Sequence, residues 1–256
     1  MDTTPDEGSV SDEALASRLA RGAGALLSAV AAEPLLRGPA LGAVGDAVSH
    51  RWIASILAQW RPEDALLSEE GVADPGRLEQ RRVWIVDPLD GTREFSERRV
   101  DWAVHVGLAV DGDPTLGAVA LPGLGLTLSS ADPGALPPAP AGPLRIAVSR
   151  TRPPAVAASV ADRLGAELVP MGSAGFKAMA VVRGEVHAYL HAGGQYEWDS
   201  AAPVAVALQR GLHASRLDGS PLRYNRPDPL LPDLMVCRAA VAADLLGAVS
   251  ETGWAA

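Results

Sequence analysis

The sequence predicts an α/β protein in two halves: an α+β half over residues 1–135 and an α/β half over residues 136–256. Three observations support this fold class. Apolar residues recur at helical spacing near the N-terminus. Short apolar runs then follow one another to about residue 128. Beyond a segment rich in Pro, Ala and Gly, strand-like and helix-like stretches alternate. We therefore expect alternating layers of helices and sheets that form one compact unit.

Two helices and a group of strands are expected in the first half. Ser11, followed by Asp12 and Glu13, is typical of a helix cap with acids in the first turn, and a second helix is expected over about residues 49–60. Apolar residues continue the first helix near helical spacing: Leu15, Leu19, Leu26, Leu27 and Val30. The apolar runs at residues 65–67, 83–86, 104–110, 116–120 and 124–128 are predicted to be strands.

The second half begins after residues 131–143, which are rich in Pro, Ala and Gly and are interpreted as a linker or long surface loop. Strands are then expected at residues 144–148, 167–169, 186–190 and 234–237. Helices are expected at residues 153–164, 173–183 and 199–209, with a last helix ending near Trp254. The sequence contains no internal repeat.

Composition excludes several classes of protein. Of the 256 residues, 48% are hydrophobic, which excludes a disordered chain, and a net charge of −9 argues against a binder of nucleic acid polymers. Residues 114–131 carry no charge, but they contain prolines and glycines, which favour strands and turns over a membrane helix. The single cysteine, Cys237, and an N-terminus without a secretory pattern favour a cytoplasmic, reducing compartment.

The most informative segment is the apolar run at residues 83–86 followed by Asp87, Pro88, Leu89, Asp90, Gly91 and Thr92. Two carboxylates three residues apart, on a turn that leaves a buried strand, repel each other unless a cation offsets their charge. Mg²⁺ prefers such hard oxygen ligands. A helix beginning at Thr92 would add free N–H groups for a phosphate. On spacing alone, a turn in which both aspartates cap the backbone explains the segment about equally well.

Two other segments carry acidic residues next to predicted elements. Glu69 and Glu70 come directly after an apolar strand, where they are either ligands or members of a solvated loop; for Glu70 the loop is the better interpretation. Asp199 precedes an Ala-rich helix, so it is either a helix cap or a ligand projected from the helix start. Taken alone, capping is the better explanation of Asp199.

Together these segments resemble a known family. The ordered trio of residues 68–70 (Ser-Glu-Glu), 84–92 (Trp-Ile-Val-Asp-Pro-Leu-Asp-Gly-Thr) and 197–203 (Glu-Trp-Asp-Ser-Ala-Ala-Pro) is similar to that of the inositol monophosphatase superfamily. The resemblance extends from about Asp46 to Asn225. It implies a layered αβαβα sandwich, a site between the two halves and a phosphatase that uses two or three Mg²⁺ ions. Members are often homodimers, which makes a homodimer a possible assembly here.

The resemblance also implies roles for individual residues. Glu69, Asp87 and the carbonyl of Leu89 would bind a first Mg²⁺, and Asp87, Asp90 and Asp199 a second. The group that attacks phosphorus would be a water molecule, and no phosphoenzyme would form.

Further roles fall on the segment after the second aspartate and on the region before the second helix. The backbone N–H groups of Gly91 and Thr92 would hold the phosphate, and Thr92 with Glu69 would orient the attacking water. Asp46 lies before the second helix, where the family places an acid beside the threonine. The family's Ser-Pro-Val-Thr stretch before that acid is absent, since residues 38–45 read Gly-Pro-Ala-Leu-Gly-Ala-Val-Gly.

Substrate-contacting residues are expected in the second half. The segments around Ser149, Arg150, Ser173 and Lys177, and residues 217–225, resemble the CysQ branch of the family, which cleaves 3′-phosphoadenosine 5′-phosphate (PAP). Arg150 and Lys177 are candidates for contacts to a second phosphate. The alternatives are a strand-end surface arginine and a helix-surface lysine. His191 stands where an arginine is common in the family.

PAP 3′-phosphatase, acting in sulfate assimilation, is the first hypothesis for function. A broader phosphatase acting on inositol monophosphate or fructose 1,6-bisphosphate is the alternative enzyme, and a metal-dependent anion sensor is the alternative of another class. Pro88 excludes a haloacid-dehalogenase-type site, which needs a nucleophilic aspartate two positions before Asp90. The histidines at 50, 105, 187 and 213 are scattered and are interpreted as structural.

Overall fold

The structure, a computed structural model, describes residues 10–72, 74–132 and 134–254. The first sheet has the order β1-β2-β3-β4-β5, with β1 parallel to β2 and the other neighbours antiparallel. Its strands are β1 (Ala65–Ser68), β2 (Arg82–Asp90), β3 (Ala103–Val110), β4 (Asp113–Leu121) and β5 (Leu126–Ser129). These confirm the strands expected in the first half, although β5 begins later because residues 122–124 form a 3-10 turn.

The second sheet has the order β7-β6-β8-β10-β9. Strand β6 is parallel to both β7 and β8, whereas β10 runs antiparallel to β8 and β9. The strands are β6 (Arg145–Ser149), β7 (Glu167–Met171), β8 (Ala188–Tyr196), β9 (His213–Ser215) and β10 (Leu230–Cys237). The short β9 was not expected from the sequence, since three residues give too little alternation to indicate a strand.

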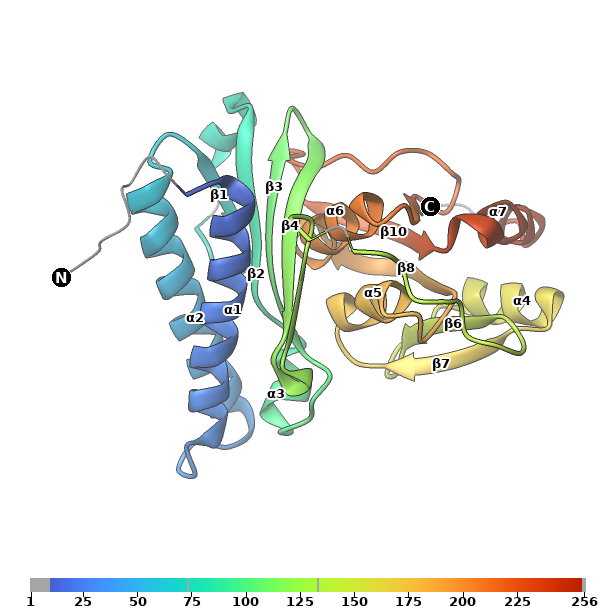
Figure 1. The fold of residues 1–256 in the computed structure, drawn as a ribbon, viewed down its shortest axis with the longest axis horizontal. Helices are drawn as coiled ribbons and strands as arrows, with labels where there is room; N and C mark the ends of the chain where they lie inside the picture. The colour runs from blue at the N-terminus through green and yellow to red at the C-terminus, as the bar shows by residue number, and fades with distance from the viewer. Residues whose placement is uncertain (1–9, 73, 133, 255–256) are drawn as a thin grey trace.

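The helices fill three layers around the two sheets (Figure 1). Helices α1 (Asp12–Ala32) and α2 (Gly38–Trp60) cover the outer face of the first sheet, α5 (Ala174–Val182) and α6 (Ala201–Gln209) lie between the sheets, and α4 (Ala155–Leu164) and α7 (Ala242–Glu251) cover the second sheet. A short helix, α3 (Thr92–Ser96), follows β2. This arrangement confirms the expected layers and the helix cap at Ser11, whose side chain accepts the N–H of Ala14.

The central layer holds the two halves together. Nearly every residue of α5 and α6 is buried, as expected for predominantly apolar helices between two sheets. Helix α6 lies so close to the first sheet that a Cβ at Gly117 of β4 would be 2.5 Å from the carbonyl oxygen of Ala202. Residues 131–143 connect the sheets without a helix or strand in their described part. The predicted boundary near residue 135 falls within this connection.

Helix α2 starts earlier than expected. The prediction that it begins near Ser49 is wrong, and Asp46 therefore lies inside the helix rather than before it. Glycine and proline favoured a loop here, but Pro39 stands in the first turn and two glycines face α3. A Cβ at Gly42 would be 2.6 Å from Ser96 Oγ, and one at Gly45 would be 2.8 Å from Phe95 Cε1. Tertiary packing thus overrides the low helix propensity of glycine.

Strand β2 also continues further than expected. Asp87 and Asp90 lie within β2, not on a turn after it, and the pairing with β3 is irregular between them. An irregularity of this kind suits Pro88, which has no N–H for the ladder. The carbonyl of Pro88 instead accepts a hydrogen bond of 2.7 Å from Ser49 Oγ on α2. The irregularity changes the direction in which the side chains at the end of β2 point.

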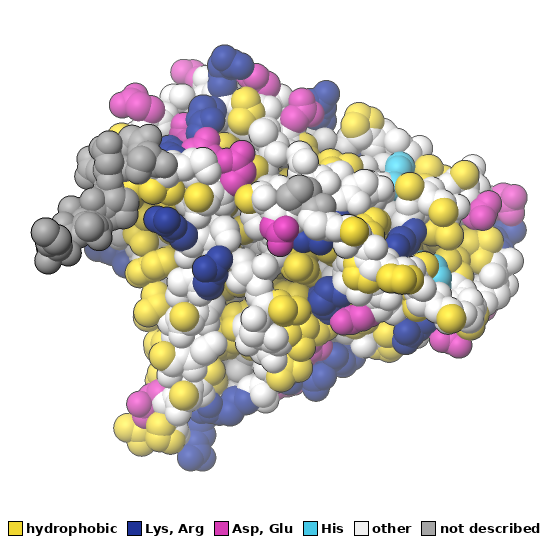
Figure 2. All heavy atoms as spheres, viewed as in Figure 1, with side chains coloured by type: hydrophobic (Ala, Val, Ile, Leu, Met, Phe, Trp, Pro, Cys, Tyr) yellow, Lys and Arg dark blue, Asp and Glu magenta, His cyan; other side chains and the backbone are white. Residues whose placement is uncertain are grey.

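The distribution of charged side chains over the surface agrees with a composition that contains both acidic and basic residues. On the face shown in Figure 2, basic and acidic side chains are interspersed over the molecule. Among the described residues, none of the helices is both long enough and apolar enough to cross a membrane. Residues 114–131 form β4, a 3-10 turn and β5, as the prolines and glycines predicted.

Candidate active site

A cavity of about 290 Å³ lies where the first sheet meets the second half of the chain. Both halves contribute to its lining. Ten of the residues predicted from the sequence line it together: Glu69, Asp87, Leu89, Asp90, Gly91, Thr92, Ser149, Ser173, Lys177 and Asp199. Segments more than a hundred residues apart in the sequence therefore meet in one polar cavity, as expected of a binding or catalytic site.

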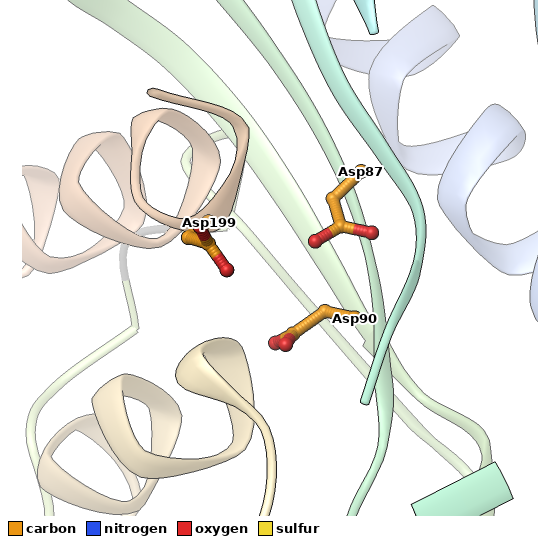
Figure 3. Close-up of side chains that lie close together, drawn as sticks. All are labelled: Asp87, Asp90 and Asp199. Atoms are coloured by element: carbon orange, nitrogen blue, oxygen red, sulfur yellow. The ribbon is translucent and has the colours of Figure 1, made fainter. Parts of the chain in front are cut away.

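Three carboxylates form the centre of the cavity. Asp87, Asp90 and Asp199 each offer an oxygen, and these oxygens lie within 4.8 Å of one another (Figure 3). The first two come from the irregular end of β2, and Asp199 comes from the 3-10 turn 197–199 that precedes α6. Asp87 and Asp90 are 2% and 6% exposed. The structure thus brings one acid of the second half to two acids of the first.

Their electrostatics favour a positive charge among them. Burial raises the pKa of Asp87 well above its ordinary value, and the charges of Asp90, Glu69 and Asp199 raise it further. Burial and the neighbouring Asp90 likewise raise the pKa of Asp199 to about 6. Buried carboxylates that repel one another are stabilised by a divalent cation with oxygen ligands. The donor set and its spacing therefore fit a metal site.

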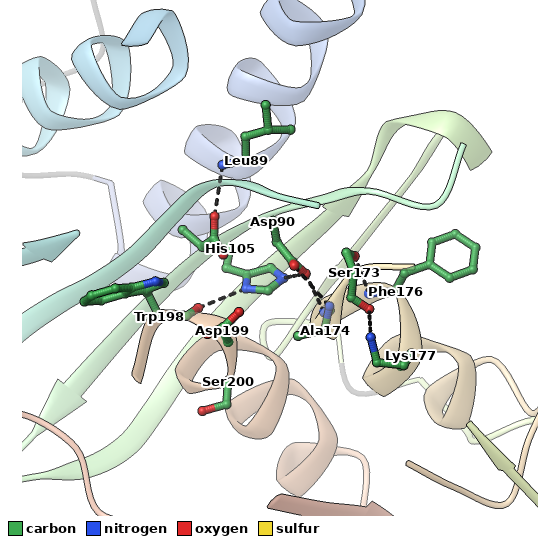
Figure 4. Close-up of polar contacts among 12 residues, drawn as sticks. Leu89, Asp90, His105, Ser173, Ala174, Phe176, Lys177, Trp198, Asp199 and Ser200 are labelled. Carbon is green, nitrogen blue, oxygen red and sulfur yellow. Dashed lines mark hydrogen bonds and ion pairs between the residues drawn. The ribbon is translucent and has the colours of Figure 1, made fainter. Parts of the chain in front are cut away.

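Asp90 differs from the other two because donors surround it. Its Oδ1 accepts the N–H of Ala174 at 3.0 Å, and its Oδ2 accepts that of Gly175 at 2.6 Å, both from the first turn of α5 (Figure 4). His105 Nε2 lies 3.1 Å from the same Oδ2. Burial opposes ionisation of Asp90, but His105, Lys177 and the N–H of Gly175 outweigh it and lower the pKa. Asp90 is therefore the acid that stays ionised most readily.

Glu69 lies at the open rim of the cavity, directly after β1. Although its side chain reaches solvent, the surrounding protein removes enough water to raise its pKa to about 7, with further contributions from Asp199 and Asp46. Its neighbour Glu70 is exposed and does not line the cavity, in agreement with the interpretation as a loop residue. Glu69 can thus reach the carboxylate cluster from the solvent side.

Asp46 contacts Thr92, which lines the cavity. Thr92 Oγ1 is 3.3 Å from Asp46 Oδ1 and 3.2 Å from the carbonyl oxygen of Leu89, so both acceptors share its proton. Burial, with the charge of Glu70, raises the pKa of Asp46 to about 6. Gly91 has φ = 90° and precedes α3, which begins at Thr92. The left-handed backbone at Gly91 favours glycine and turns the chain sharply into the helix.

Lys177 is buried rather than on a helix surface. It is 4% exposed, its Nζ donates to the carbonyl oxygens of Gly172 and Ser173, and it lies 5.2 Å from the centre of the Tyr189 ring. Burial lowers its pKa to about 8. The hydroxyl of Ser173 caps α5 by accepting the N–H of Phe176 at 3.1 Å. The alternative of a helix-surface lysine is therefore wrong.

Arg150 does not line the cavity, whereas Arg152 does. Arg150 pairs with Asp101 and lies 3.5 Å from Glu94 Oε1. Asp101 also accepts the N–H of Gly172, which joins the rim of the first half to the loop before α5. Arg93 and His191 line the cavity as well, and no role was predicted for them from the sequence. Their place in the cavity depends on contacts between distant segments of the chain, which no local sequence motif predicts.

The comparisons with known proteins agree with this geometry. The inositol monophosphatase family profile matches residues 16–136 and 142–251. The chain is 54% identical over 239 residues to "3′-phosphoadenosine 5′-phosphate phosphatase" of Mycobacterium tuberculosis, with 90% of each chain covered. It is 51% identical over 256 residues to the protein of the same name from Mycobacterium leprae, with 94% of each covered.

Solved structures show the same fold. CysQ from Bacteroides thetaiotaomicron, described as a bacterial member of the inositol monophosphatase family, superimposes with a TM-score of 0.76 at 26% identity. The superposition covers 91% of this chain and 99% of the other. The family profile, the close relatives and the carboxylate cluster lead to one conclusion: this chain belongs to the inositol monophosphatase family.

Proposed function

We propose that this chain is a Mg²⁺-dependent phosphatase that uses water to remove the 3′-phosphate of PAP, giving AMP and inorganic phosphate, in sulfate assimilation. The observation that carries the proposal is the 54% identity, over 90% of the chain, to a relative named for this substrate. The cluster of Asp87, Asp90 and Asp199 supports it, because three carboxylates in one cavity suit a divalent cation that activates water and neutralises a phosphate.

The metal site would use ligands from both halves. Asp87, Asp90 and Asp199 would hold one Mg²⁺, while Glu69, Asp87 and the carbonyl of Leu89 would hold another. Support comes from the mutual distances of the three aspartates and from the position of Glu69 at the rim. When bound, the cations would neutralise charge on the phosphate and on the departing oxygen.

The remaining chemistry would rest on residues at the start of α3. The N–H groups of Gly91 and Thr92 would bind the oxygens of the 3′-phosphate. Thr92 Oγ1 and the Glu69 carboxylate would orient the attacking water. Asp46 would fix the Thr92 hydroxyl, since the two side chains are 3.3 Å apart. Proximity and alignment of this kind contribute strongly to phosphoryl transfer.

The second phosphate of PAP would bind toward the second half. Ser149, Ser173 and Lys177 line that side of the cavity, together with Arg152. An ammonium group has three N–H donors, and two of those on Lys177 go to backbone carbonyls, which leaves one for a phosphate. Arg150 would contact substrate only after releasing Asp101. A homodimeric assembly and a cytoplasmic location remain predictions.

A panel of phosphate-release assays tests the proposal. Wild-type protein would be incubated with PAP, inositol 1-phosphate and fructose 1,6-bisphosphate, each with Mg²⁺ and with excess chelator. We expect the highest kcat/KM for PAP and no release in chelator. A preference for either of the other two substrates would move the protein to the broader phosphatase, and Mg²⁺ binding without turnover would favour the anion sensor.

A further inference from the structure

His105 lies where the two halves of the site meet, yet the function proposed above gives it no role. It stands on β3 directly opposite Asp87 of β2, and its side chain is 0% exposed. A buried imidazole surrounded by apolar residues is usually a core residue. Each ring nitrogen of His105, however, faces a residue connected with the carboxylate cluster.

The Nδ1 atom joins His105 to the segment that carries Asp199. It lies 3.0 Å from the carbonyl oxygen of Trp198, the residue before Asp199 (Figure 4). A carbonyl oxygen only accepts hydrogen bonds, so Nδ1 must carry a hydrogen. The 3-10 turn 197–199 is thereby tied to a strand of the first sheet.

The Nε2 atom faces Asp90. It lies 3.1 Å from Asp90 Oδ2, and it has no other hydrogen-bond partner in the described part of the chain. The first turn of α5 closes over it, since a Cβ at Gly175 would be only 2.0 Å from Nε2. The same turn donates the N–H of Gly175 to Asp90 Oδ2. The ring is therefore confined against the carboxylate by the helix above it.

We propose that His105 is a positioning residue of the metal site, which orients Asp90 through Nε2 and fixes the segment of Asp199 through Nδ1. The inference rests on the proposed metal ligands and deepens that proposal. Side chains that orient metal ligands through such contacts change metal affinity or activity by about 10- to 100-fold when replaced. His105 is expected to act in this way and to have little effect on the binding of substrate groups far from the metal.

Two substitutions separate the ring nitrogens. His105→Asn places an amide near Nδ1, so it keeps the donor to Trp198 and loses the contact with Asp90. His105→Gln places an amide nitrogen near Nε2 and restores the contact with Asp90. The matched control is His187→Asn: His187 is another buried histidine, whose Nδ1 accepts the N–H of Arg145 at 3.0 Å, and it does not line the cavity.

The experiment measures binding of Mg²⁺ to metal-free protein by isothermal titration calorimetry, after thermal unfolding has shown which variants are folded. We expect His105→Asn to weaken Mg²⁺ binding about tenfold, and His105→Gln and His187→Asn to stay within about threefold of wild type. Activity on PAP over a range of Mg²⁺ concentrations gives a second readout, in which KM for PAP should change less than the Mg²⁺ concentration needed for half-maximal rate.

The outcomes separate this inference from the proposed function. Equal Mg²⁺ affinity of His105→Asn and wild type would overturn the role of His105, as would equal losses for the Asn and Gln variants. If His105→Asn does not fold, a tenfold loss in His105→Gln, which keeps the contact with Asp90, would overturn the role of Nε2, and failure of both variants to fold would make His105 a core residue. Absence of Mg²⁺ binding to wild type would instead contradict the proposed metal site.

Discussion

Asp90 is the residue at which the carboxylate cluster and the central helix layer meet, because both of its oxygens accept N–H groups of α5 while it faces Asp87 and Asp199. An amide is a poorer ligand for a hard cation, and its NH₂ group would oppose those N–H donors. We expect Asp90→Asn to lower kcat by at least an order of magnitude.

Steady-state kinetics on PAP with saturating Mg²⁺ would measure this loss. The control is Asp113→Asn, since Asp113 is an exposed residue paired with Arg223 away from the cavity. That variant should keep wild-type rates. Full activity of Asp90→Asn would exclude Asp90 as a metal ligand.

Lys177 offers a test of substrate choice. With two N–H donors used by the carbonyls of Gly172 and Ser173, its third is expected to bind the second phosphate of PAP. Lys177→Met keeps the length of the side chain and removes the donors. We expect KM for PAP to rise about tenfold, on the scale of one lost charge-assisted hydrogen bond. The rise for inositol 1-phosphate, which has one phosphate, should be smaller.

Paired measurements on both substrates would decide between two roles of this lysine. Equal losses on PAP and inositol 1-phosphate would mean that Lys177 serves the loop 172–173 and not the second phosphate. Arg152→Met is a useful companion, since Arg152 lines the same cavity from an exposed position. An effect confined to PAP in both variants would indicate a shared phosphate site.

At the scale of elements, the contact between α2 and α3 shows why α2 includes Gly45. A Cβ there would lie 2.8 Å from Phe95 Cε1 and 3.0 Å from Leu89 Cδ2. Alanine normally stabilises a helix relative to glycine, but overpacking costs about 1–3 kcal/mol. We expect Gly45→Ala to lower the free energy of unfolding by about 1–2 kcal/mol.

Urea unfolding would test this prediction against a second glycine. Gly247 lies within α7 and is exposed, and a Cβ added there would meet no atom within 4 Å. Gly247→Ala should therefore raise the free energy of unfolding by about 0.5–1 kcal/mol. Stabilisation by both substitutions would show that the α2–α3 contact is looser than the distances indicate.

An ion-pair network joins α1 to β2. Asp12 accepts Arg61 Nε at 2.6 Å and Arg82 Nη2 at 2.8 Å. Burial alone would raise the pKa of Asp12, but the hydrogen bonds from Arg82 and Arg61 outweigh it and lower the pKa below the ordinary value of 3.8. Because the folded pKa is lowered, this stabilisation is fully present above about pH 4 and is lost as the pH falls through the folded pKa.

Asp12→Asn should accordingly reduce the free energy of unfolding by about 1–2 kcal/mol near neutral pH and by less at about pH 3. Urea unfolding at both pH values would measure the difference. In Asp111→Asn the lost partner is the exposed Arg81, so no measurable change is expected. A loss for Asp12→Asn that is independent of pH would assign the effect to packing of the side chain rather than to the ion pairs.

At the scale of the whole molecule, the two halves share a core. Ile85 and Val119 of the first sheet belong to the same cluster of buried residues as Tyr189 and Val236 of the second. Both halves also contribute side chains to the cavity and to the carboxylate cluster. Separation at residue 135 would expose these faces to water, and we expect neither fragment to fold alone.

Circular dichroism of the fragments 1–135 and 136–256, and of the full chain, would test this expectation. The full chain should unfold in one transition that is the same in far- and near-ultraviolet signals. The isolated fragments should lack near-ultraviolet bands. Two separate transitions in the full chain would show that the halves are independent domains.

Sequence alone was sufficient for much of the fold and for the candidate ligands. The cap at Ser11, the apolar runs of the strands and the helices of the second half are local patterns, and the structure contains all of them. The ligand candidates Glu69, Asp87, Asp90 and Asp199 stand in short contiguous motifs, and the structure places all four in one cavity. These four residues can be recognised as candidate ligands from the local sequence, without knowledge of contacts between distant residues.

The tertiary structure decided what depends on contacts between distant residues. Helix α2 includes Asp46 because its glycines pack against α3, although their propensity opposes a helix. Arg150 turns to Asp101, and Lys177 is buried over Tyr189, as no local spacing indicated. His105 is a single histidine in an apolar run, and only the approach of α5 and of the turn 197–199 brings it to the site. Local sequence determines which carboxylates are candidate metal ligands, whereas packing between the sheets determines which other side chains surround them.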